Sequence, residues 1–334
     1  MDTSDSENVL RRRVLTAAAL APVLAGAGTA AARGGRPAVQ DGAGATRRLR
    51  PVTTTAEDWH GVARAMGRTG IMAGAEYQLG FLRDDLRVTS RGVSVHPALA
   101  VGSHVSFVRY DDGSTLLMGD LAIAESELQH VIGSLHAKGL QQTAIHKHLL
   151  AHSPEVWWVH VHGHRHDAKA LAGALRSALD RTATPARARP VERVKGLDTK
   201  RIAAVLGVKG FDDEGVHKCL FFRRETVTMG CLVMPPGLGA MSAFLFQPLG
   251  GGRAAVNGDF AMTADEVQHV LAALHRGGVS IIELHNHGLD DEPRLFFVHF
   301  WAVGDAVQIA RTLRRAVDAT DVAPFEPVHP AGTR

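Results

Sequence analysis

The sequence predicts an α+β protein made by tandem duplication of two similar units, each a mixed or antiparallel sheet with helices packed on one face. Residues 119–139 align without gaps on residues 258–278, an offset of 139. A stretch rich in proline and arginine, residues 183–196, marks the boundary between the units. We expect the units to pack with pseudo-twofold symmetry. At the same offset, three histidines of each unit correspond: His146, His148 and His160 align with His285, His287 and His299.

The elements of the first unit follow from local patterns. Residues 55–68 begin with a threonine cap and predict an amphipathic helix. Strand-like segments follow at 77–82, 86–89, 93–95, 104–110 and 115–123, with Asp112-Gly113 at a hairpin turn. A helix over 125–138 ends at Gly139, and another covers 167–181. The second unit repeats this order.

The N-terminal residues resemble an export signal. Arg11, Arg12 and Arg13 precede a short, alanine-rich apolar run that ends at Ala32, in a pattern similar to a twin-arginine signal. The run is too short and too rich in alanine to span a membrane. We therefore assign residues 1–32 to an export signal peptide, 33–54 to a flexible leader, 55–187 to the first repeat and 188–325 to the second. A bacterial protein that is secreted or held in the cell envelope, exported by the twin-arginine route and without a transmembrane segment in its mature chain, is expected.

Charge argues against nucleic-acid binding. After residue 50 the chain carries 29 basic and 30 acidic side chains, so the folded part is near neutral. The sequence has no phosphate-binding glycine loop, nucleophile elbow or Cys/His nucleophile pair. The two cysteines, Cys219 and Cys231, are compatible with a disulfide or with buried thiols.

Histidine is the unusual residue, with 19 copies, and its clustering carries the functional signal. Side chains two apart on a strand share a face, so His146 and His148 lie together, as do His160, His162 and His164. The turn-forming residues 149–154 predict that the two strands fold back as a hairpin. In the second repeat Glu283, His285 and His287 share a face, and His299 lies across the turn.

These patterns predict metal binding. Neutral imidazole is the commonest protein ligand of transition metals, so a divalent ion, zinc or copper, is the expected cofactor. The second repeat offers His285, His287 and His299, an open set to which Glu283 adds a fourth ligand or a catalytic base for a metal-bound water, as in a hydrolase. The four imidazoles His146, His148, His160 and His162 form a more closed set, suited to storage, a structural ion or copper.

A second interpretation stays open. Alternating polar residues also mark the solvated face of a sheet. The protein would then be a non-catalytic envelope module that binds a small molecule or a cell-wall component, with structural histidines. His130 and His269 are expected on helix surfaces, and Asp120 and Asp259, each after a glycine at a strand end, are expected to form turns or cap helices.

A family resemblance rests on the motifs together: G-D, an acidic helix, L-H-N-H, E-P-x-x-F-F-x-H, and G-D before the last helix. Over residues 55–325 this order resembles the LppY/LpqO-like family of exported bacterial proteins, built around a domain of unknown function. The chain departs from the pattern by lacking a lipoprotein cysteine, by Lys147 in place of asparagine, and by Arg165-His166-Asp167 in place of G-D. The resemblance implies export and duplication, and no activity.

Overall fold

The computed structural model describes residues 47–185 and 194–325. The predicted signal peptide, most of the leader and the junction between residues 187 and 188 lie outside the described residues. The first repeat comprises η1 (Ala56–Trp59), α1 (His60–Met66), β1 (Ile71–Ala73), β2 (Glu76–Leu82), β3 (Thr89–Ser90), β4 (Val93–Ser94), α2 (Pro97–Ala100), β5 (Gly102–Arg109), β6 (Thr115–Ala124), α3 (Glu125–Ala137), β7 (Gln141–His146), β8 (His152–Ser153), β9 (Val156–Arg165) and α4 (Ala168–Leu179). The second comprises α5 (Thr199–Leu206), β10 (Phe211–Asp213), β11 (Val216–Arg223), β12 (Thr228–Met229), β13 (Leu232–Val233), β14 (Met241–Gly250), β15 (Arg253–Met262), α6 (Ala264–Arg276), β16 (Ser280–His285), β17 (Asp291–Glu292), β18 (Phe296–Asp305), α7 (Ala306–Val317) and β19 (Val322–Pro324).

The two repeats have the same sheet topology, which confirms the predicted α+β duplication. The strand order is β1-β2-β5-β6-β9-β7 in the first repeat and β10-β11-β14-β15-β18-β16 in the second, with β19 paired to β11. All neighbouring strands are antiparallel. The predicted histidine hairpin is the β7–β9 pair, and its counterpart is β16–β18.

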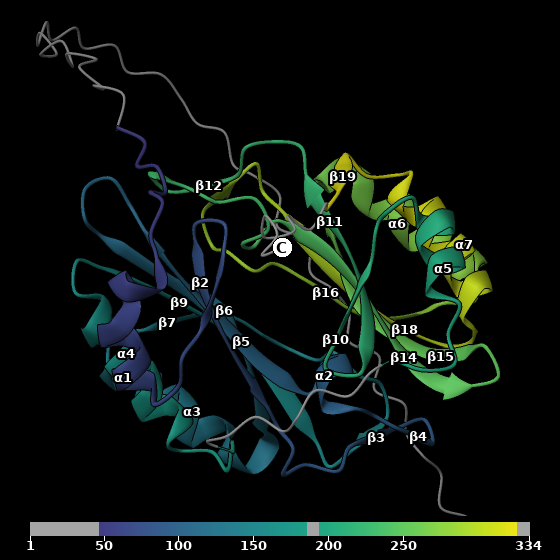
Figure 1. Cartoon of the computed structure of the whole chain (residues 1–334), viewed down its shortest axis with the longest axis horizontal. Helices are drawn as coiled ribbons and strands as arrows, with labels where there is room; N and C mark the ends of the chain where they lie inside the picture. The colour runs from purple at the N-terminus through teal and green to yellow at the C-terminus, as the bar shows by residue number, and fades with distance from the viewer. Residues whose placement is uncertain (1–46, 186–193, 326–334) are drawn as a thin grey trace, which may run out of the picture. The chain divides into compact units, whose positions relative to one another are not determined.

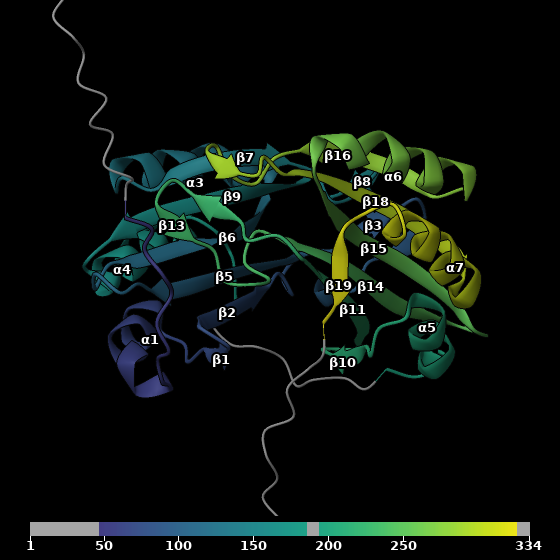
Figure 2. The same ribbon diagram turned by 90° about the horizontal axis from the view of Figure 1, so that it is seen from above.

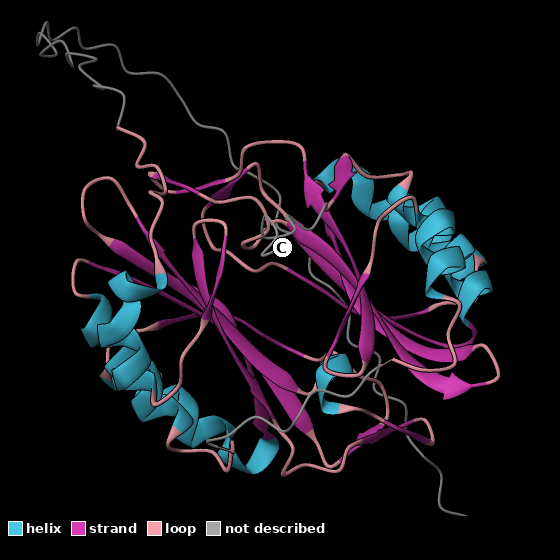
Figure 3. Ribbon diagram, viewed as in Figure 1, coloured by secondary structure: helices cyan, strands magenta, loops and turns pink. Residues whose placement is uncertain are grey.

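Each sheet carries its long helices on one face (Figures 1 and 3). Helix α3 buries Leu128, Val131 and Leu135, the helical spacing of an apolar stripe. Helix α6 starts at a capping box in which the Glu266 carboxylate accepts the Thr263 N–H at 2.8 Å. Burial of each large apolar side chain contributes about 1.5–3 kcal/mol, so these faces hold the helices on the sheet.

The other face of each sheet packs against the other repeat. One shared apolar cluster contains Trp158 and Trp301, and a second contains Met118 and Phe297, so each draws on both repeats. The Tyr110 hydroxyl donates to the Val233 carbonyl at 3.1 Å across the same boundary. Strands β7 and β16 lie next to each other, with α3 and α6 flanking them (Figure 2). The described residues therefore belong to one compact unit.

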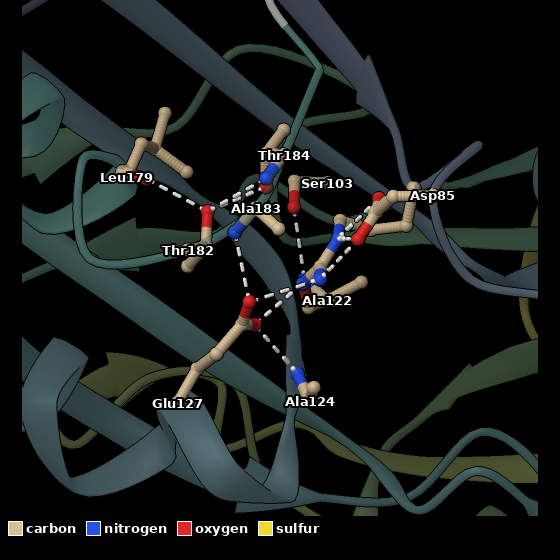
Figure 4. A network of polar contacts seen from close by, with 10 residues as sticks. Asp85, Ser103, Ala122, Ala124, Glu127, Leu179, Thr182, Ala183 and Thr184 are labelled. Carbon is tan, nitrogen blue, oxygen red and sulfur yellow. Dashed lines mark hydrogen bonds and ion pairs between the residues drawn. The ribbon is translucent and has the colours of Figure 1, made fainter.

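A buried guanidinium group braces each repeat. Arg83, fully buried, donates to the Glu127 carboxylate at 2.7 Å and to Asp85. Glu127 also accepts the Ala183 N–H at 2.8 Å, which ties the chain after α4 to α3 (Figure 4). Arg223 makes the equivalent network in the second repeat, with the side chains of Glu225 and Glu266. Both cysteines are free thiols, Cys219 in the core.

Candidate metal centre

Three histidines from each repeat meet between the two sheets. The ring centroids of His146 and His285 are 4.0 Å apart, those of His148 and His299 are 3.8 Å apart, and those of His160 and His287 are 4.0 Å apart. His148 corresponds to His287, and His299 corresponds to His160, so a pseudo-twofold rotation turns the second pair into the third. Each pair joins the two repeats, so the ligand sets predicted for the separate repeats lie against each other.

Strand register places the histidines beside two carboxylates. His160 in β9 lies opposite Asp120 in β6, and His299 in β18 lies opposite Asp259 in β15. The expectation that Asp120 and Asp259 form turns or helix caps is also wrong, since both lie within strands. Their preceding glycines are required by close packing: a Cβ on Gly119 would lie 2.2 Å from the His104 carbonyl oxygen.

The loops that follow β7 and β16 are anchored by the opposite repeat. His146 and His285 end their strands, and His148 and His287 follow two residues later. The Asn257 side-chain amide donates to the His148 carbonyl at 2.7 Å. The Glu283 carboxylate accepts the backbone N–H of Lys147, so the structure places this predicted base on the loop that carries His148.

Asp120, His146 and His148 form a triangle of potential ligand atoms. The two histidine Nε2 atoms are 2.9 Å apart, and Asp120 Oδ2 lies 3.1 Å from His148 Nε2 and 3.7 Å from His146 Nε2. A tetrahedral ion with bonds of about 2.0–2.1 Å has its ligand atoms about 3.3–3.4 Å apart. The triangle therefore has the size that a bound transition metal requires.

Two further groups of three have their ligand atoms within 4.8 Å of one another: His146, His285 and His299, and Asp259, His287 and His299. The group of His146, His285 and His299 spans both repeats. It shares His146 with the triangle of Asp120, and it shares His299 with the group of Asp259. The candidate ligands therefore form one connected centre.

Several polar atoms of this centre are buried and unpaired. Among the described residues, these atoms have no hydrogen-bond partner: Nδ1 of His146, His160 and His285, Nε2 of His285 and His299, and Oδ1 of Asp120. More than about 90% of buried polar groups in folded proteins are paired, so such a concentration calls for an explanation. His299 Nδ1 lies 3.3 Å from the Gly258 carbonyl, which favours a proton on Nδ1 and a free lone pair on Nε2.

The protonation states suit cation binding. Burial lowers the pKa of His160 and of His285 to about 4. Burial, followed by the neighbouring imidazoles, lowers the pKa of His146, His148, His287 and His299 well below the usual value. All six imidazoles are thus neutral at pH 7, the form that binds metal. Burial also raises the pKa of Asp259 to about 7, and the charge of Asp120 adds to this effect.

The structure leaves the remaining predicted ligand of the first repeat outside the cluster. His162 shares the face of His160, but its Nδ1 faces the Gln141 side chain at 3.2 Å. His164 lies farther along β9, 2.7 Å from the Ser114 hydroxyl. The exposed His130 and His269 lie on α3 and α6, as expected. Sequence reasoning missed Asp120 and Asp259 as members of the site, although the repeated G-D pair within an apolar stretch marked both.

Fold and site together define a duplicated α+β protein with a histidine and aspartate cluster between its repeats. The chain belongs to the family described as Domain of Unknown Function (DUF1259), which matches residues 60–181 and 200–319. No curated protein matches the sequence. Among solved structures, a double-ringed trimeric shell protein from the RMM microcompartment is 13% identical, over 61% of this chain and 82% of that one, with a TM-score of only 0.17. Within the described residues, no helix is long and apolar enough to cross a membrane.

Proposed function

We propose that this protein binds a divalent transition metal between its two repeats, through histidines of both repeats and through Asp120 or Asp259. The observation that carries the proposal is the set of unpaired, buried ring nitrogens that meet there. Leaving buried polar groups unpaired costs about 1–3 kcal/mol each, and coordination to a cation would remove that cost.

The donor atoms restrict the metal. The candidate ligands are imidazole nitrogens and carboxylate oxygens, without a thiolate or thioether among them. Imidazole suits zinc, copper, iron and nickel, whereas soft sulfur ligands select copper(I). We propose zinc(II) or copper(II) as the resident ion. Positive charge would also favour ionised Asp259, because a nearby cation lowers the pKa of a carboxyl group.

Elemental analysis of protein purified without a histidine tag tests the proposal. The wild type is expected to carry metal in a fixed ratio to the chain, and the double variant His285→Ala/His287→Ala is expected to lose it. The matched control His269→Ala/His275→Ala removes two exposed histidines from α6 and is expected to keep the metal. Absence of metal from the wild type after growth and refolding with zinc or copper would overturn the proposal.

A metal-dependent hydrolase is the narrower form of this proposal. It is supported by the mixed histidine and aspartate ligand set, which leaves room for a metal-bound water. Glu283, the predicted base, accepts the Lys147 N–H, so a role as base requires this contact to open. The alternative, a non-catalytic envelope module, is supported by the extensive packing of the histidines on one another, and it predicts no bound metal.

We also propose that the protein is an exported bacterial protein of the LppY/LpqO-like group, with residues 1–32 as a twin-arginine signal. This route exports folded proteins, so it would allow the metal to bind before export. Replacing Arg11 and Arg12 by lysine is expected to retain the precursor in the cytoplasm, detected by fractionation and by its uncleaved mass. Normal export of that variant would argue against the twin-arginine route.

A further inference from the structure

The inner faces of the two sheets are covered unequally. Strand β6 is buried on both faces along nearly its whole length, as is β15. In β2, β5, β11 and β14, by contrast, the side chains that face the other repeat are at least partly exposed at several positions. Contact between the repeats therefore closes the central strands and leaves part of the inner face of the outer strands open to solvent.

One row of residues leads from this open face to the centre. Strand register aligns Gly80 in β2 with His104 in β5, His104 with Asp120, and Asp120 with His160. Gly80 and His104 are exposed, whereas Asp120 and His160 are buried. A Cβ added to Gly80 would meet no atom within 4 Å, so there is free space in front of this position.

His104 is exposed and lies between Gly80 and the buried Asp120 in this row. Burial lowers the pKa of His104, while the charge of Asp120 raises it and the charge of Lys218 in the second repeat lowers it. The Lys218 amine is paired with the Asp213 carboxylate at 2.8 Å.

The row of the second repeat has different chemistry. It runs from Leu220 through Ala243 to Asp259 and His299. Ala243 stands at the position that corresponds to His104, and both Leu220 and Ala243 are partly exposed. The row of the first repeat thus carries a hydrogen-bonding side chain, His104, whereas the corresponding positions of the second repeat are apolar.

We propose that an exogenous ligand reaches the metal along the Gly80–His104–Asp120 row, and that this ligand is a small anion which binds the metal while His104 donates a hydrogen bond to it. The inference rests on the proposed metal centre and adds to it an access route and a ligand class. His104 is the exposed donor beside the buried ligands on this row, and the positive charge of the metal favours an anion. The corresponding Ala243 cannot serve this role, so ligand entry distinguishes the two repeats.

Azide binding to the copper(II)-loaded protein tests the inference, because azide coordinated to copper(II) gives a charge-transfer absorption. The wild type is expected to bind azide. Gly80→Phe places a ring over His104 in space that is free, and is expected to keep the copper content and to weaken azide binding at least tenfold. Gly133→Phe is the matched control, since Gly133 on α3 also has no atom within 4 Å of an added Cβ. It is expected to bind azide like the wild type.

A second variant covers the case in which Gly80→Phe does not fold. His104→Leu, which removes the donor, is expected to weaken azide binding about tenfold, the loss that corresponds to one hydrogen bond to a charged group. Unchanged azide affinity in the folded Gly80→Phe protein, or in His104→Leu, would overturn the inference. Copper-loaded wild type that binds no azide would also overturn it while leaving the metal centre intact. A wild type that takes up no copper or zinc would instead refute the proposed function on which the inference rests.

Discussion

The pH dependence of folding in the metal-free protein tests whether the interface histidines are buried as neutral groups. Burial lowers the pKa of His160 to about 4 in the folded protein, whereas a histidine in the unfolded chain titrates near 6.5. Below pH 6.5 the unfolded chain therefore takes up a proton that folded His160 excludes until about pH 4. The free energy of unfolding therefore does not depend on His160 titration above pH 6.5. Below pH 6.5 it falls, because of His160, by about 1 kcal/mol per pH unit.

Asp259 acts in the opposite direction. Its pKa of about 7 means that the folded protein keeps a proton which the unfolded chain releases above about pH 4. Its contribution to stability therefore falls as the pH rises from 4 to 7. The total slope combines both effects, so the difference between a variant and the wild type isolates a single histidine.

The variant is His160→Gln, with His269→Gln as an exposed control. The free energy of unfolding is measured by urea denaturation in EDTA at several values between pH 5 and 6.5. We expect the slope of His160→Gln to be shallower than that of the wild type by about 1 kcal/mol per pH unit. The control keeps the wild-type slope because its side chain is exposed to solvent. Parallel slopes for His160→Gln and the wild type would refute the claim that His160 is held neutral by burial.

Three further predictions follow from the structure. Arg83→Met should lower the free energy of unfolding by about 3–5 kcal/mol, because Glu127 keeps a partly buried charge without its partner. The control Arg176→Met removes an exposed ion pair on a helix and should lower it by less than about 1 kcal/mol. Zinc at about 100 times its dissociation constant should stabilise the protein by about 3 kcal/mol in a thermal melt, and EDTA should reverse this; a melt insensitive to both contradicts the metal centre. Glu283→Gln weakens the hydrogen bond that anchors the loop of His148. It should raise the metal dissociation constant, measured by competition with a chelator, about fivefold, with little change in melting temperature. Unaltered affinity would show that this anchor does not position His148.

The fold was accessible from the sequence because its signals are local and repeated. The cap at Thr55, the turn at Asp112-Gly113 and the alternation around His160 each depend on neighbouring residues alone, and the repeat at an offset of 139 residues shows the same patterns twice. Helix α3 and the β7–β9 hairpin formed where these patterns placed them. The packing of one repeat on the other has no such signal.

Strand alternation predicts the histidines of the centre but not the contact between the two repeats. It places His146 in a set of its own repeat, and in the structure its ring also stacks on His285 of the other. That contact depends on which sheet faces meet, a tertiary property that strand alternation does not specify. Asp120 was assigned to a strand end because glycine followed by aspartate is typical of turns. The glycine is instead needed for close approach to the neighbouring strand, and the sequence does not distinguish these two uses.

The central claim is that histidines of both repeats form one metal centre, and metal content after changing one repeat alone tests it most directly. His146→Ala/His148→Ala alters only the first repeat, and His285→Ala/His287→Ala alters only the second. For a shared centre, each double variant should lose essentially all the metal that the wild type carries, while circular dichroism shows that both remain folded. Retention of half the metal by each variant would show two independent sites, and full retention by both would show that these histidines do not bind it.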